Sequence, residues 1–301
     1  MVPEWFYFAI LSLILISIVN IIDKILVSNY SITPLAFVMI LGASSFMPMV
    51  TLLFFRLTSL PVHVVALTIV VGFIRIYYTL PYFKSLTIEE VSRVVPLLQL
   101  TPLFVLGLSS FILNESLKAQ NYAAFVLLVL GGTLFSIKPG KRLRVSTAFY
   151  LMIVSSFLFA VYNIALKYLY SFNDFYTIFI WVQVGSFAAF FQLFALKRFR
   201  NYLIQAYAAS NKRIGVAITL EQVVAYISIA CSNYAISLGP VALISALGSM
   251  QPLFVLLFAT LVSLQFPHVL DENLTRADVV LKGSGIIAIF VATYIINFVT
   301  I

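Results

Sequence analysis

Apolar residues fill long stretches of the chain, and charged or Pro/Gly-containing breaks divide these stretches into segments of roughly 20 residues, enough for a helix to span a bilayer. Strands of a membrane barrel would instead alternate polar and apolar positions. The pattern therefore predicts an all-α polytopic membrane protein with ten transmembrane helices. The expected spans are 4–27, 34–56, 62–84, 90–112, 119–137, 147–169, 174–196, 214–237, 241–264 and 283–300.

The ten expected spans form two related sets of five. Pro102-Leu-Phe-Val-Leu recurs as Pro252-Leu-Phe-Val-Leu in the second half of the chain. Two further pairs match: Asn20-x-x-x-Lys24 with Asn163-x-x-x-Lys167, and Tyr82-x-x-Ser85-Leu86 with Tyr234-x-x-Ser237-Leu238. Five is an odd number, so the second set must insert upside down, as an inverted repeat. We expect a first five-helix repeat at 1–137, a basic linker loop at 138–146 and a second five-helix repeat at 147–301.

Composition places the chain in lipid and narrows its function. Hydrophobic residues make up 62% and charged residues 9% of the chain, whereas a soluble domain carries about 25% charged residues. The single cysteine excludes an internal disulfide and a cysteine-based metal cluster. The chain has no phosphate-binding loop and no hydrolase or metalloprotease motif. We therefore expect neither an enzyme nor a bound cofactor or metal.

The basic residues predict how the chain sits in the membrane. They gather in the loops after the fifth and seventh spans: Lys138, Lys141, Arg142, Arg144, Lys197, Arg198, Arg200, Lys212 and Arg213. Cytoplasmic loops are enriched in Lys and Arg, so these loops account for the net charge of +8 without a nucleic-acid partner. We expect an integral protein of the cell (plasma or inner) membrane with both termini outside. Between Phe199 and Tyr207 an apolar helical stripe indicates either a helix in the membrane interface or an ordinary loop.

Charged residues inside expected spans are the first candidates for chemistry, because they are costly in lipid and face a cavity or a partner. Arg75 lies near the middle of the third span, and Glu221 lies about two turns into the eighth, its repeat-related partner. The predicted topology brings both to a similar depth. They are expected to form a buried ion pair, structural or functional, or a split site for a zwitterion. Glu221 is also a candidate for proton coupling, because burial and a nearby arginine both alter the proton affinity of a carboxyl group.

Other polar residues in the spans extend this candidate site. Lys24 and Lys167 either snorkel to the interface or line a vestibule shared by the repeats. Pro102 and Pro252 free the carbonyls four residues earlier, which either line a cavity or mark a packing kink. The other expected cavity residues are Asn20, Tyr78, Gln99, Gln222, Tyr226, Asn233 and Gln251.

These features together resemble the EamA-like branch of the drug/metabolite transporter superfamily over nearly the whole chain. The resemblance rests on the five-plus-five spans, the Asn-x-x-x-Lys and Tyr/Ser-Leu pairs, and Pro102 with Glu115 at the end of the same span. The second copy departs from the pattern, with Gln265 where a Glu is expected. The resemblance implies secondary transport, commonly export, and a central cavity lined by helices 1, 3, 4, 6, 8 and 9.

We therefore expect a secondary-active transporter, working as an exporter of a small organic solute such as an amino acid, metabolite or drug. It would act by alternating access between the two repeats, with proton coupling through Glu221 as a hypothesis. The alternative is an uncoupled facilitator or channel. The expected partners are a small-molecule substrate and the lipid bilayer, and a monomer would suffice.

Overall fold

The computed structural model describes residues 3–29, 33–113, 127, 130, 146–209, 212–239, 241–248, 250–265, 280, 283–288, 290, 291 and 294. Every regular element in this part of the chain is helical. Six spans in it are long and apolar enough to cross a membrane: Glu4–Val27, Pro34–Leu53, Val62–Leu86, Thr147–Leu169, Phe175–Ala195 and Ile214–Leu238. These spans confirm an all-α integral membrane protein.

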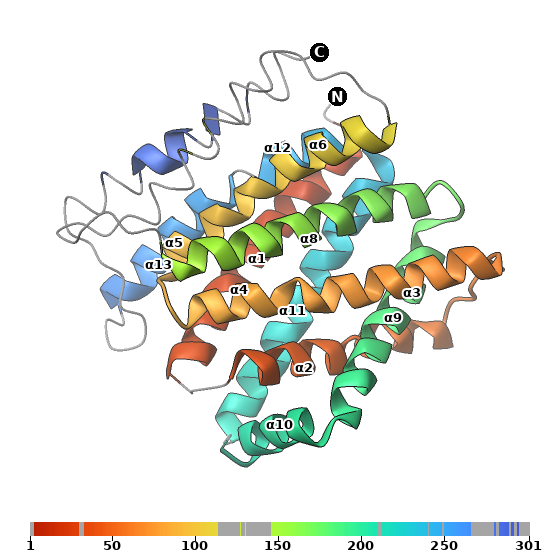
Figure 1. Ribbon diagram of the computed structural model, residues 1–301, viewed down its shortest axis with the longest axis horizontal. Coiled ribbons are helices and arrows are strands. Elements are labelled where there is room, and N and C mark those ends of the chain that lie inside the picture. The colour runs from red at the N-terminus through yellow and green to blue at the C-terminus, as the bar shows by residue number, and fades with distance from the viewer. Residues whose placement is uncertain are drawn as a thin grey trace.

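The helices follow the expected order in both halves of the chain (Figure 1). The first half contains α1 (Glu4–Asn29), α2 (Pro34–Ser44), η1 (Met47–Leu53), α3 (Val62–Tyr77), α4 (Thr79–Leu86), α5 (Val91–Val94), η2 (Val95–Leu100) and α6 (Thr101–Leu113). The second half contains α8 (Thr147–Leu169), α9 (Phe175–Ala195), α10 (Lys197–Ala209), α11 (Lys212–Leu238), α12 (Val241–Gly248) and α13 (Gln251–Gln265). Nearly all of the expected span 119–137 lies outside the described residues, and 283–300 is described only in part, so the total of ten spans stays a prediction.

Several expected spans are interrupted near a proline. The span 34–56 divides into α2 and the 3₁₀ helix η1, which has Pro48 in its first turn. The span 90–112 contains the 3₁₀ helix η2 between α5 and α6, with Pro96 in its first turn. The Leu98 carbonyl, expected to be bared by Pro102, accepts a hydrogen bond from the main-chain N–H of Thr101 at the end of η2. The tighter 3₁₀ turn satisfies this group locally, so that expectation is wrong for Leu98.

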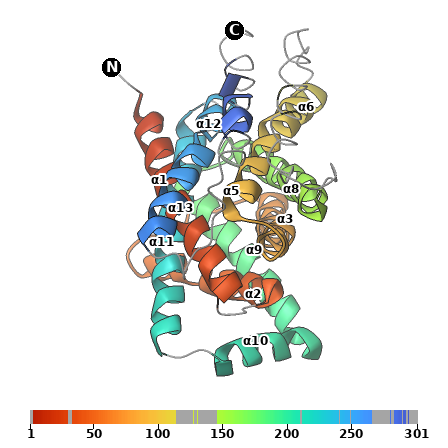
Figure 2. The same ribbon diagram turned by 90° about the vertical axis from the view of Figure 1, so that its left-hand side faces the viewer.

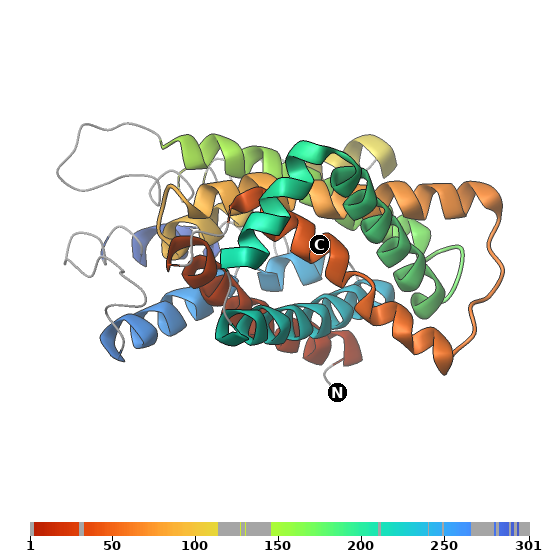
Figure 3. The same ribbon diagram turned by 90° about the horizontal axis from the view of Figure 1, so that it is seen from below.

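Two close helix pairs organise the bundle. Figure 3 shows α11 lying along α1, and Figure 1 shows α9 crossing α3. The α3–α9 crossing passes through Gly72 and Gly185, where the backbones come so near that no side-chain atom would fit between them. The Ser186 hydroxyl donates to the Gly72 carbonyl across the crossing (3.1 Å). Small residues allow membrane helices to approach closely in this way.

The outer surface of the bundle is apolar, as lipid contact requires. On α13, Leu253, Leu257 and Leu261 follow one another at helical spacing and are 48%, 51% and 48% exposed. A soluble protein rarely leaves a continuous row of leucines in water, whereas acyl chains cover such a row at no cost.

The amphipathic segment after the seventh expected span forms the helix α10. It lies at one edge of the bundle beside α2 and α9 (Figures 1 and 2). Phe199 and Leu203 pack against the main apolar core, while Ile204 is exposed. The structure thus favours the helix over the ordinary loop. Some residues of its apolar stripe pack against the core, and others are exposed on the surface.

Two lysines, one in each half of the chain, hold the ends of neighbouring helices. Lys24 Nζ donates to the carbonyls of Leu86 and Glu89, both at 2.8 Å, at the C-terminal end of α4. Lys167 Nζ donates to the carbonyls of Ile236 and Gly239, at 3.1 and 3.0 Å, at the end of α11. A cation at a helix C-terminus binds carbonyls that have no partner within the helix. The two lysines are therefore lysine clamps that tie α1 to α4 and α8 to α11.

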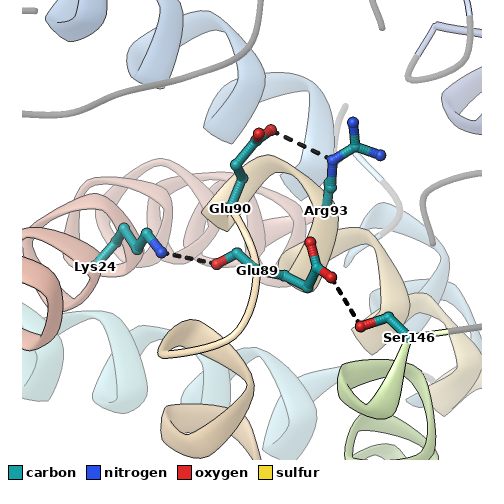
Figure 4. A network of polar contacts seen from close by, with 5 residues as sticks. All are labelled: Lys24, Glu89, Glu90, Arg93 and Ser146. Carbon is teal, nitrogen blue, oxygen red and sulfur yellow. Dashed lines mark hydrogen bonds and ion pairs between the residues drawn. The ribbon is translucent and has the colours of Figure 1, made fainter. Parts of the chain in front are cut away.

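The first lysine clamp belongs to a larger polar network, shown in Figure 4. The Glu89 side chain accepts a hydrogen bond from the hydroxyl of Ser146, the N-cap of α8 (2.8 Å). Glu90 forms an ion pair with Arg93 (3.4 Å) in the following turn. Lys167 lies at the opposite end of α8, so the two lysine clamps are separated by about 30 Å at 1.5 Å per residue. This is about the thickness of a bilayer's hydrocarbon core.

Replacing Lys24 by methionine should lower the stability of the fold. Hydrogen bonds from a charged donor contribute on the order of 2 kcal/mol each, so we expect the midpoint of thermal unfolding in detergent to fall by several degrees. Lys84→Met is the matched control, because Lys84 is also at the end of α4 but its side chain is exposed. Equal unfolding midpoints for the two variants would show that the first lysine clamp does not stabilise the protein.

Candidate functional site

A cavity of about 220 Å³ lies among the helices. Its walls come from α1, α3, α4, α6 and α8 and from α11, α12 and α13, with single residues of α2 and η2. Its polar and charged lining residues are Ser12, Asn20, Asp23, Arg75, Tyr78, Thr79, Tyr82, Thr101, Tyr162, Asn163, Glu221, Ser228, Ser232, Asn233 and Gln251. Both halves of the chain therefore contribute to one polar cavity.

Arg75 is the cation among the described lining residues, and its contacts with them are all with neutral groups. Its side chain is 2% exposed. Nη1 donates to Ser45 Oγ (3.2 Å) and to the Tyr226 hydroxyl (3.5 Å), and the guanidinium lies 5.1 Å from the centre of the Tyr226 ring. The Tyr226 hydroxyl is fixed in turn by the Leu41 carbonyl (3.1 Å). These contacts hold the arginine in place without neutralising its charge.

The ion pair expected between Arg75 and Glu221 is absent. Both residues are described, both line the cavity, and the two side chains are not within the 4.0 Å of an ion pair. The two side chains reach different heights along α11. Arg75 contacts Tyr226, which is five residues, or about 7 Å, beyond Glu221 on that helix. Gln222 Nε2 donates to the Glu221 carboxylate (2.7 Å), and the Ser44 hydroxyl donates to Gln222 in turn. The second expectation, a site divided between the two charges, fits this geometry.

Asp23 is a buried carboxylate that the sequence reasoning missed. It is 3% exposed, on α1, and it lies near enough to Glu221 for the two carboxyl groups to interact electrostatically. The Tyr82 hydroxyl lies 2.9 Å from Asn20 Oδ1 and 3.3 Å from Asp23 Oδ2. The available signal was a third polar residue, between Asn20 and Lys24, in an otherwise apolar span. The adjacent lysine made it resemble a residue at a solvated helix end.

Four buried side-chain atoms on the cavity lining have no hydrogen-bond partner. They are Asn20 Nδ2, Asp23 Oδ1, Arg75 Nη2 and Thr101 Oγ1. A buried polar atom without a partner costs about 1–3 kcal/mol, and most such atoms in proteins are satisfied. Donors and acceptors left open around a single cavity indicate a place where a polar solute binds.

The structure brings most of the predicted site residues together. Asn20, Arg75, Tyr78, Glu221, Asn233 and Gln251 line the cavity. Gln222 and Tyr226 stand behind it and hold Glu221 and Arg75. The side chain of Gln99 and the whole of Glu115 lie outside the described residues. Lys24 and Lys167 are not part of the lining, so the vestibule expected for them is not formed by the described residues.

Aromatic rings form one wall of the cavity. Tyr78 packs against Phe159 with ring centres 4.9 Å apart, and Phe159 stacks on Tyr162 at 6.1 Å. Asn233 Nδ2 donates to the Tyr162 hydroxyl (3.2 Å), which fixes that ring. No group of three or more His, Cys, Asp or Glu side chains within the described part of the chain could hold a metal ion. The site therefore offers charges, hydroxyls and aromatic faces to an organic solute.

Comparison with known proteins identifies the kind of protein that carries this cavity. Residues 4–137 match the model of the EamA-like transporter family. The match covers 134 of the 301 residues, and over this part the chain resembles a family of membrane transporters for small molecules, which is not a family of enzymes. The matched residues of this EamA-like protein include Asn20, Asp23, Arg75 and Thr101, the four cavity-lining residues with open polar atoms.

A solved structure shares the fold across both halves of the chain. A structure titled "Crystal structure of protein" covers 96% of this EamA-like chain and 97% of its own, with 13% identity and a TM-score of 0.58. It is among 28 chains from solved structures that match. At this identity the likeness shows the fold alone. The search of curated proteins found no match.

Proposed function

We propose that this EamA-like protein is a secondary-active transporter that exports a small organic solute by alternating access. The single observation that carries the proposal is the cavity that both halves of the chain line, with four unpartnered polar atoms on its walls. A solute that satisfies these atoms would bind midway between two related halves, which is where secondary transporters place their substrates.

The proposed arrangement is two inverted five-helix repeats, 1–137 and 147–301, joined by the basic linker 138–146. The two lysine clamps support it, because each lysine holds two carbonyls three residues apart, in opposite halves and at opposite ends of α8. We further propose that the chain sits in the cell membrane with its basic loops in the cytoplasm and both termini outside.

The size of the cavity narrows the proposed substrate. Drug-sized ligands occupy pockets of about 300–1,000 Å³, and this cavity measures about 220 Å³. A metabolite the size of an amino acid therefore fits better than a drug. Arg75 and the two carboxylates would recognise its charges, while Asn20, Asn233 and Gln251 would offer neutral hydrogen bonds.

Coupling to protons would use the two carboxyl groups. Asp23 and Glu221 come from α1 and α11, face one cavity and interact electrostatically. Like charges that face one cavity resist ionising together, so a proton on the pair would be exchanged for a substrate cation. A transporter that trades a proton for its substrate in this way is driven by a pH gradient.

Transport in proteoliposomes tests the proposal. We expect an imposed pH gradient to accumulate a solute chosen from a metabolite library. In Glu221→Gln, accumulation should fall at least tenfold while solute exchange at equal pH persists. Glu4→Gln is the matched control, because Glu4 is exposed in the first turn of α1. Full gradient-driven accumulation by Glu221→Gln would refute the coupling. Wild-type transport that only dissipates a solute gradient at any pH would favour the alternative, an uncoupled facilitator or channel.

A further inference from the structure

We propose that the substrate is a small zwitterion with its two charges at opposite ends, as in an ω-amino acid. Its carboxylate would bind Arg75, and its ammonium group would bind Asp23 beside Glu221. This inference rests on the proposed function, since it names the class of solute that the cavity takes.

The anionic end follows from the surroundings of Arg75. A guanidinium buried in a membrane protein needs an opposite charge to offset its loss of hydration, and this one touches only the hydroxyls of Ser45 and Tyr226 and an aromatic ring. Its Nη2 is left without a partner on the cavity lining. A planar guanidinium pairs best with a carboxylate. A substrate carboxylate would supply both the missing charge and the missing acceptor.

The cationic end follows from the two buried carboxylates. Asp23 and Glu221 line the same cavity, and Asp23 Oδ1 lacks a partner. Lys24 is next to Asp23 in sequence, but its Nζ is directed to the carbonyls of Leu86 and Glu89 instead. Among the described residues, no lysine or arginine therefore forms an ion pair with either carboxylate. An ammonium group has three donors and would serve Asp23 and Glu221 together.

The helix register separates the two ends. Tyr82, which contacts Asp23, is seven residues beyond Arg75 in the span Val62–Leu86, a rise of about 10 Å. On α11, Tyr226 contacts Arg75 and stands five residues, or about 7 Å, from Glu221. Both helices thus place the cationic and anionic ends of the site several ångströms apart. In an α-amino acid with an uncharged side chain, both charges are carried by groups on one carbon, so such a molecule would reach only one end.

Part of the lining between the two ends is apolar. Leu13, Ile16 and Val19 of α1 face the cavity, and Phe159 and Tyr78 face it from α8 and the α3–α4 junction. A chain of methylene groups joining an ammonium to a carboxylate would cover these surfaces. The proposed orientation therefore places an apolar spacer against apolar walls and each charge against its opposite.

Four ligands test the inference: ε-aminocaproate, its isomer norleucine, caproate and n-pentylamine. The purified protein is assayed for thermal stabilisation and, in proteoliposomes, for exchange of radiolabelled ε-aminocaproate. We expect ε-aminocaproate to bind at least tenfold more tightly than norleucine, which has the same atoms with the charges adjacent. Caproate and n-pentylamine, which each lack one charge, should also bind at least tenfold more weakly. Equal or tighter binding of norleucine, or of either single-charge ligand, would overturn the inference.

Variants of the lining residues test which residue binds which charged end of the ligand. In Asp23→Asn, ε-aminocaproate should lose its advantage over caproate but keep its advantage over n-pentylamine. Ser17→Ala, on the same helix but outside the cavity lining, should change neither. A loss of both advantages would contradict the assignment of Asp23 to the ammonium group. If none of the four ligands binds while another solute is transported, the inference fails and the proposed function stands. If folded protein transports no solute of the library, the proposed function itself fails.

Discussion

Gly72→Ala should remove most of the folded protein. A Cβ atom at position 72 would lie 2.4 Å from the Val182 carbonyl oxygen and 2.5 Å from the Ser186 nitrogen, and both are main-chain atoms that no rotamer change can move. The helices α3 and α9 would have to separate. This would also disturb the contact at Gly185, where an added Cβ atom would lie 2.4 Å from the Ile69 carbonyl oxygen. Overpacking typically costs about 1–3 kcal/mol, and a clash with rigid backbone should reach the upper end or exceed it.

The measurement is the yield of monodisperse protein after detergent extraction, together with its thermal unfolding midpoint. Gly107→Ala and Gly215→Ala are the matched controls, because a Cβ atom at either position would meet nothing within 4 Å. Both controls should match or slightly exceed the wild type, since alanine is the better helix former by about 1 kcal/mol. A wild-type yield and midpoint for Gly72→Ala would mean that α3 and α9 do not cross at this point.

Arg75→Gln should abolish transport without destabilising the protein. Losing a buried charged partner costs on the order of 2–5 kcal/mol in binding, so the transport rate should fall by about 100-fold or more. The unfolding midpoint should stay the same or rise, because no carboxylate in the described part of the chain is within ion-pair distance of Arg75, and its removal leaves none of them unpaired.

Arg93→Gln gives the opposite result and serves as the control. Arg93 is as deeply buried as Arg75, but it forms an ion pair with Glu90 at the start of α5 and is not part of the cavity lining. Its loss should lower the unfolding midpoint while the transport rate per folded molecule is kept. If Arg75→Gln transports normally, or if it unfolds as readily as Arg93→Gln, the role of Arg75 in the cavity is wrong.

The sequence was sufficient for the helices but not for their internal breaks. Eight of the expected spans coincide with described helical segments, because a run of apolar residues long enough to cross a bilayer has few alternatives to a helix. The 3₁₀ segments η1 and η2 were not foreseen. Pro48 and Pro96 were visible, but a proline is compatible with a kink, a break or a change of helix type, and tertiary packing selects among them.

The candidate site was predicted in its composition but not in its pairing. Arg75 and Glu221 stand out because a charge in mid-span is costly, and both line the cavity. Their ion pair was inferred from depth alone. Depth does not give the direction of a side chain around its helix, and Arg75 points to Tyr226. Asp23 was missed for a related reason, because its neighbour Lys24 reaches away from the cavity to α4.

The 3₁₀ helix η2 is wound more tightly than an α-helix of the same length. Each residue of a 3₁₀ helix advances 120° around the axis where an α-helical residue advances 100°, so the six residues Val95–Leu100 are overwound by about 120° relative to an α-helix and longer by about 3 Å. Thr101, the next residue, faces the cavity with an unpartnered hydroxyl. Relaxation of η2 to α geometry would turn that hydroxyl a third of the way around the helix and draw α6 one or two residues closer to α5. A change of helical pitch, without any bending, would thus alter which polar groups the cavity presents.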